Sequence, residues 1–120
     1  MDVAVRDLVA DSFAASVGVV VDGAGAPIDA SAAVPISASC LEGDGVQREI
    51  ILDFGTGDNA RSVSQILDVW TAAGYDADRA MQEDIRYSET LPVARMSIRD
   101  RSSIDGMLNM TITSACVTAE

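Results

Sequence analysis

The segment whose spacing points most directly to chemistry is DFGTGDNARS, residues 53–62. Residues 55–60 match the G-x-G-x-x-G/A spacing that holds a pyrophosphate between a strand and a helix. Asp76 lies about where an acidic ligand for a ribose is expected. However, no apolar strand leads into Asp76, and Asp58 would place a negative charge beside the pyrophosphate. A tight strand-to-helix turn with Asp58 or Asn59 as the N-cap explains these residues better than a dinucleotide site.

Acidic residues offer a second kind of chemistry, because Asp76 and Asp78 open a segment like a calcium loop. An EF-hand needs Gly at its sixth position and Glu at its twelfth, where this sequence has Met81 and Tyr87. Another calcium arrangement or a carboxylate pair for acid–base catalysis stays open beside a solvated acidic face. The carboxylates concerned are Asp53, Asp58, Asp76, Asp78, Glu83 and Asp84.

The residue types that are missing exclude several mechanisms. The chain has no histidine and only two cysteines. Serine and cysteine nucleophiles activated by histidine, histidine metal sites and a four-cysteine zinc site are therefore excluded. We expect no catalytic residues, no cofactor and no metal, and a protein that is not an enzyme.

The two cysteines, Cys40 and Cys116, each end a short strand-like segment, residues 35–40 and 111–116. Their even number and the absence of a CxxC pair favour a disulfide over two buried free thiols, which stay the alternative. A bond would close a loop of roughly 77 residues and stabilise the fold by about 4.5 kcal/mol in the chain-entropy model. A disulfide would imply an oxidising compartment.

Three arginines, Arg95, Arg99 and Arg101, gather near one predicted strand and its turn. The alternation of the strand places Arg95 and Arg99 on the face opposite Met96. An exposed sheet face with arginines and threonines could bind an anionic partner or a polysaccharide. Salt bridges to the many carboxylates are the alternative.

Hydrophobic periodicity defines the elements that must position these residues. Apolar residues at helical spacing predict helices over 3–17 and 59–73, the second ending at Gly74. Alternating apolar and polar residues predict four strands, at 35–40, 46–54, 91–99 and 107–116. The polar segment 76–90 fits a short helix or a loop.

The element order predicts the fold class α+β with the arrangement αββαββ. We expect a four-stranded, mainly antiparallel sheet with two helices packed on one face. The cysteines would meet if the first and fourth strands were parallel neighbours in the order 2-1-4-3.

Length and charge limit the remaining choices. The 120 residues fit a single domain spanning 1–120. A net charge of −11 disfavours nucleic acid, and no apolar segment is long enough to span a membrane. No export signal begins the sequence. If the cysteines are bonded, we expect that a native export signal has been removed.

The layout resembles the soluble domains of small actinobacterial cell-envelope lipoproteins, a group largely of unknown function. The points of similarity are the N-terminal helix, Cys40 after the first strand, the helix ILDVWTAAGY and a last strand ending TSAC. The resemblance implies a lipid anchor on a cysteine preceded by a lipobox, which this sequence lacks. It implies membrane contact through that anchor alone.

These observations lead to an expected function and one alternative. We expect an acidic, non-catalytic extracytoplasmic domain, in the cell envelope or secreted, that binds a protein or an envelope component through an open sheet face. Arg95, Arg99 and Arg101 are the candidate binding residues. The alternative is a small-ligand carrier with an apolar pocket between helices and sheet, lined by Met96, Met107 and Met110.

Overall fold

The computed structural model describes residues 2–29, 35–40, 45–80, 83–88, 93–101 and 106–116. This part of the chain is α+β and contains two helices, α1 (Asp2–Ala15) and α2 (Asn59–Ala72). Six strands accompany them: β1 (Ile36–Ser39), β2 (Val46–Phe54), β3 (Asp76–Ala80), β4 (Glu83–Tyr87), β5 (Val93–Arg101) and β6 (Met107–Ser114).

The strands form one sheet in the order β1-β2-β6-β5-β4-β3, and every neighbouring pair is antiparallel. The α+β class and the antiparallel sheet were predicted correctly. The strand number was wrong, since the described residues contain six strands and not four. The predicted order 2-1-4-3 was also wrong, because β6 pairs with β2 and not with β1.

The two unpredicted strands form the hairpin β3–β4 at one edge of the sheet. A strand is recognised by an alternation that buries one face, and the β3 sequence DADRA has no such alternation. In β4 only Ile85 and Tyr87 have the spacing of two. Pairing with β5, the next strand along the chain, makes this polar segment extended.

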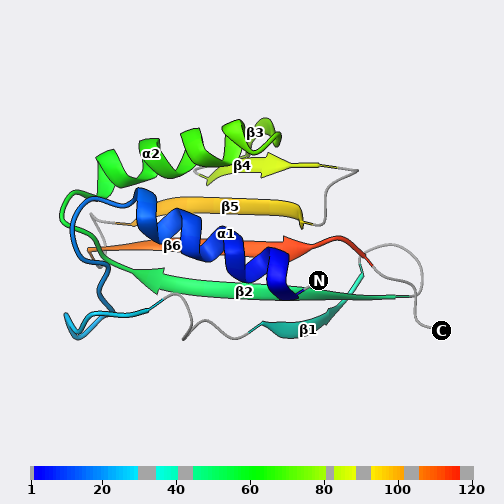
Figure 1. Cartoon of the computed structure of the whole chain (residues 1–120), viewed down its shortest axis with the longest axis horizontal. Coiled ribbons are helices and arrows are strands. Elements are labelled where there is room, and N and C mark those ends of the chain that lie inside the picture. Colours follow the sequence, from blue (N-terminus) through cyan, green and yellow to red (C-terminus); the bar gives the residue numbers. More distant parts are fainter. Residues whose placement is uncertain are drawn as a thin grey trace.

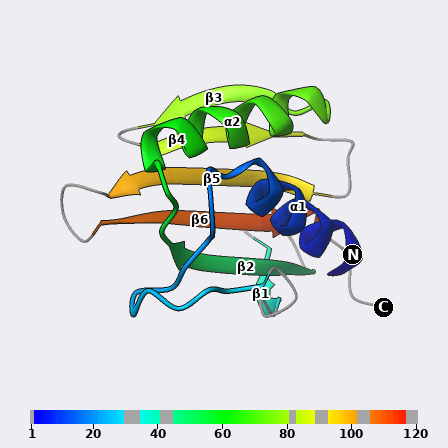
Figure 2. The same cartoon turned by 60° about the vertical axis from the view of Figure 1, so that its left-hand side comes forward.

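Both helices lie on the same face of the sheet, as predicted (Figures 1 and 2). α1 packs over β2 and β6, and α2 packs over β4 and β5. Neither helix is long and apolar enough to cross a membrane. The opposite face of the sheet is covered by no helix in the described ranges.

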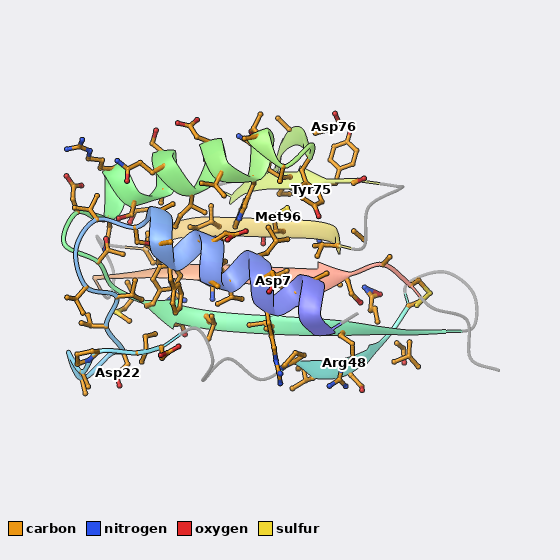
Figure 3. The ribbon with its side chains drawn as sticks, viewed as in Figure 1. Asp7, Asp22, Arg48, Tyr75, Asp76 and Met96 are labelled. Atoms are coloured by element: carbon orange, nitrogen blue, oxygen red, sulfur yellow. A yellow bond between two sulfur atoms is a disulfide. The ribbon has the colours of Figure 1, made fainter. Side chains whose placement is uncertain are left out.

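The core fills the space between the helices and the sheet. The ring centroids of Phe13 and Phe54 lie 5.3 Å apart. Met96, labelled in Figure 3, and Met110 are completely buried there with Trp70. In a chain with only 4% aromatic residues, flexible methionines fill volume that aromatic rings fill elsewhere.

One buried polar contact joins the two helices. The Trp70 Nε1–H donates to Ser12 Oγ at 2.9 Å, and the Ser12 hydroxyl donates to the Leu8 carbonyl at 2.6 Å. Ser12 and Trp70 are both fully buried. The serine therefore satisfies an indole N–H that has no access to water.

The turn between β2 and α2 has the predicted capping geometry. The Asp58 carboxylate accepts the Arg61 N–H at 3.1 Å and caps the helix. The Gly57 N–H donates to the Val17 carbonyl at 2.7 Å, and a Cβ on Gly57 would lie 3.1 Å from that oxygen. This glycine therefore permits a close backbone contact with Val17. The segment around Val17 thus occupies the side of the turn where a dinucleotide would have to bind.

The predicted disulfide between Cys40 and Cys116 is present, with Cα atoms 5.9 Å apart and 76 residues of separation (Figure 3). The proposed strand neighbours were wrong, because β2 lies between β1 and β6. β2 is antiparallel to both, so β1 and β6 still run in the same direction. Both cysteines lie at the end of the sheet where β2 begins, and the Cys40 N–H donates to Gly45 O at 3.3 Å.

We expect Ser12→Ala to lower the free energy of unfolding by about 1–3 kcal/mol, because it leaves the Trp70 N–H buried and unsatisfied. Ser16→Ala is the matched control, since the Ser16 hydroxyl donates to the Ser12 carbonyl and satisfies no buried donor. Denaturant unfolding followed by fluorescence of the single tryptophan measures both. Equal losses in the two variants would contradict the role assigned to Ser12.

We expect the double variant Cys40→Ala/Cys116→Ala to lose about 3–5 kcal/mol of unfolding free energy, because its unfolded chain is no longer restrained by the long loop. Urea unfolding with and without reductant measures this loss. Reductant should destabilise the native chain and leave the double variant unchanged. A native chain that is indifferent to reductant would contradict the prediction.

Candidate functional site

The candidate site is the face of the sheet that turns away from the helices, here called the open face. The strand registers arrange its side chains in rows that cross the strands. The Glu49 row contains Ile36, Glu49, Thr113, Arg95, Tyr87 and Asp76. The Ile51 row contains Ile51, Thr111, Ser97 and Ile85. The Asp53 row contains Asp53, Asn109 and Arg99.

In the Glu49 row, an acid on β2 and a base on β5 lie on either side of a polar residue of β6. The Thr113 hydroxyl donates to Glu49 Oε2 at 3.2 Å. Arg95 is exposed on the other side of Thr113. Two apolar side chains flank these residues, Ile36 at 53% exposure next to Glu49 and Tyr87 at 40% exposure next to Arg95. Asp76, labelled in Figure 3, extends the row onto β3.

The Asp53 row repeats the order of acid, polar residue and base. The Asn109 amide Nδ2 donates to Asp53 Oδ1 at 2.9 Å. Arg99 pairs with Asn109 from the β5 side. In both rows, β6 thus carries a side chain that holds the carboxylate of β2 in place before any partner arrives.

From Ile51 to Ile85 the Ile51 row between them is uncharged, and the register of β3 continues it at Asp78. Ile51 on β2 is 55% exposed, whereas Ser97 and Ile85 are only 8% and 5% exposed. The central core cluster does not include Ile85. The open face therefore carries an exposed apolar side chain on one side of Thr111 and two nearly buried residues, Ser97 and Ile85, on the other.

The structure brings together the three arginines predicted for binding, since Arg95, Arg99 and Arg101 all lie on the open face of β5. Other arginines hold the fold together. The Arg86 Nε donates to Thr71 Oγ1 of α2 at 3.1 Å, and Arg48 (Figure 3) donates to the Pro35 carbonyl at 3.1 Å. Whether an arginine is a candidate binding residue or a structural one thus depends on the face of the sheet on which it lies.

The residues of β2 and β1 that complete the surface were not predicted from the sequence. Ile51 belongs to an apolar run, Ile50, Ile51 and Leu52, in which the period alone marks it as outward. On β1, alternation groups Ile36 with Cys40, and this pattern predicts a buried face for both. Register with Glu49 places Ile36 on the open face, while Ser37 faces Arg48 on the helix side.

Other chemistry is not assembled by the described residues. No group of three histidine, cysteine or carboxylate residues within the described ranges could hold a metal ion. The side chains of Asp78, Glu83 and Asp84 lie outside the described part, so the calcium alternative stays untested there. Asp58 caps α2 and Asp53 accepts from Asn109, so both have local structural partners.

The methionines proposed to line a carrier pocket lie on two faces. Met96 and Met110 are fully buried in the core. Met107 is half-buried and pairs with Arg101, on the side away from the helices. The three side chains therefore do not line one space between helices and sheet.

One described group has a shifted pKa, and it belongs to the core. Burial raises the pKa of the Tyr75 phenol above its ordinary value of 10.0, and a hydrogen bond with the Val93 backbone lowers it in part. Tyr75 follows Gly74, whose φ of 102° ends α2. It contributes to stability and is not part of the open face.

In comparisons with known proteins, no family model, curated protein or solved structure matches the chain. The disulfide is consistent with an extracytoplasmic location. The surface itself is therefore the basis for a functional proposal.

We expect the native chain to lose stability as pH rises above 10, because the unfolded tyrosine ionises while buried Tyr75 stays neutral. The contribution is fully present below pH 10 and is lost as pH rises through the raised folded pKa. Tyr75→Phe should flatten this alkaline slope, and Tyr87→Phe, on an exposed tyrosine, should not. Unfolding free energies measured between about pH 8 and 11 provide the test, and equal slopes in all three proteins would contradict it.

Proposed function

We propose that this protein is a non-catalytic extracytoplasmic domain, in the cell envelope or secreted, that binds a protein through the open face. The observation that carries the proposal is the chemistry of this face. Three of the large apolar side chains that are exposed, Ile36, Ile51 and Tyr87, all belong to it. Charged residues of both signs surround them.

A protein partner fits this surface better than the anionic partner or polysaccharide considered from the sequence. An anion site would need a concentration of positive charge, whereas Arg95 and Arg99 each have an acid two strands away. Apolar side chains interspersed with opposite charges are typical of a protein interface, where aromatic and arginine residues contribute most.

The disulfide supports the proposed compartment. Stable disulfides form in oxidising surroundings, and this one contributes a large share of a typical folding free energy. The resemblance to envelope lipoproteins supports the same location. Rapid acid quenching of intact cells followed by thiol labelling would give no labelled Cys40 or Cys116 if the protein is exported.

The binding proposal is tested with a photo-crosslinking amino acid placed at Ile51 on the open face and, as the matched control, at Asp11. Asp11 is exposed on α1, on the helix side of the sheet. We expect a discrete adduct from position 51 in cells that make the protein, and its loss when Tyr87→Asp is added. Equal labelling from positions 51 and 11 would overturn the proposal. The mass of the adduct identifies the partner as a second copy or another protein.

A further inference from the structure

We propose that the partner of the open face is the open face of a second copy, related by a two-fold axis that runs along β6. This inference rests on the proposed function and names its partner. In such a pair the two sheets stack face to face at about 10 Å, and β2 of each copy lies over β5 of the other. β6 lies over β6, because it is the strand between them.

Charge complementarity is the first argument. Glu49 and Arg95 are one strand from β6 on opposite sides, in the same row. Rotation about β6 brings Arg95 of one copy over Glu49 of the other. The same rotation brings Arg99 over Asp53 in their row. Each pair occurs twice, so the symmetric contact contains four oppositely charged pairs and is self-complementary.

The apolar residues match under the same rotation. In the Glu49 row, Ile36 and Tyr87 are each two strands from β6, on opposite sides of it. The rotation therefore places Ile36 of each copy over Tyr87 of the other copy. In the Ile51 row, Ile51 at 55% exposure lies over Ser97, a small residue at 8% exposure. Ile85 borders that position. An exposed side chain thus meets a small residue that does not obstruct it.

The carboxylates are already oriented for this contact. Thr113 holds Glu49 at 3.2 Å and Asn109 holds Asp53 at 2.9 Å, so less side-chain freedom is lost on association. The alternative two-fold axis, across the strands, would place β2 over β2 and bring like charges together. The arrangement of charge therefore selects the axis along β6.

The size of the face fits a reversible dimer. Five strands at ~4.8 Å spacing and about seven residues at ~3.4 Å give a patch of roughly 24 by 24 Å. Two copies would bury on the order of 1,000 Å² in total, at the low end for specific protein contacts. In a chain of net charge −11, this balanced face is also where two copies can approach with little local repulsion.

Sedimentation equilibrium of the purified, disulfide-bonded chain tests the proposal through charge reversal. Arg95→Glu alone and Glu49→Arg alone each create two like-charge contacts, and we expect each to weaken dimerisation by about a hundredfold. An equimolar mixture of the two variants should dimerise again at close to the native Kd. In that heterodimer one native pair and one reversed pair are both attractive.

Two controls separate this geometry from general electrostatics. Arg101→Glu changes the same strand, but the register of β2 with β6, continued by one residue, places uncharged Gly55 in its row. Its effect should therefore be far smaller than that of Arg95→Glu. Arg6→Glu changes an exposed residue of α1 and should have no effect. Circular dichroism confirms that all variants fold.

The failures of this inference and of the proposed function are distinguishable. A native chain that stays monomeric, or a mixture that fails to recover the dimer, overturns the two-fold contact. If position 51 still gives an adduct of another mass in cells, binding through the open face stands with a different protein. If position 51 gives no specific adduct and the chain is monomeric, both proposals fail.

Discussion

The register of β6 between β2 and β5 is the constraint on which the rest of this structure depends. Because side chains alternate along a strand, this register decides two surfaces at once. It places Leu108, Met110 and Ile112 under the helices, where all three are fully buried. It also places Asn109 and Thr113 beside the acids of β2 on the other face. A slip by one residue would exchange the core and the proposed binding face.

The two helices and the disulfide secure this register from different sides. α1 and α2 cover the apolar face and are joined at the buried contact between Ser12 and Trp70. The bond between Cys40 and Cys116 links the end of the edge strand β1 to the end of the central strand β6. With few aromatic residues in the core, this covalent restraint on the unfolded chain supplements the free energy from apolar burial.

The open face also shows why the binding residues predicted from the sequence were an incomplete set. Arginines gathered near β5 were visible in the sequence, and their face was predicted from alternation. Their acidic counterparts, Glu49 and Asp53, lie more than 40 residues earlier and are brought level with them only through β6. The pairing of base and acid is thus a property of the sheet, and it supports the proposed protein partner over the anionic partner considered for the arginines alone.

The sequence by itself determined both helices, the strand β2 over residues 46–54, the buried face of β6 and the bonded cysteines, because hydrophobic periodicity and cysteine number are local or compositional signals. Only the tertiary structure decided the strand order, the β3–β4 hairpin and the outward position of Ile36. An edge strand with a polar sequence has little apolar pattern of its own, and its conformation comes from pairing with the neighbouring strands of the sheet. Strand order likewise depends on which distant backbone groups find partners, and the period of one segment carries no information about that choice.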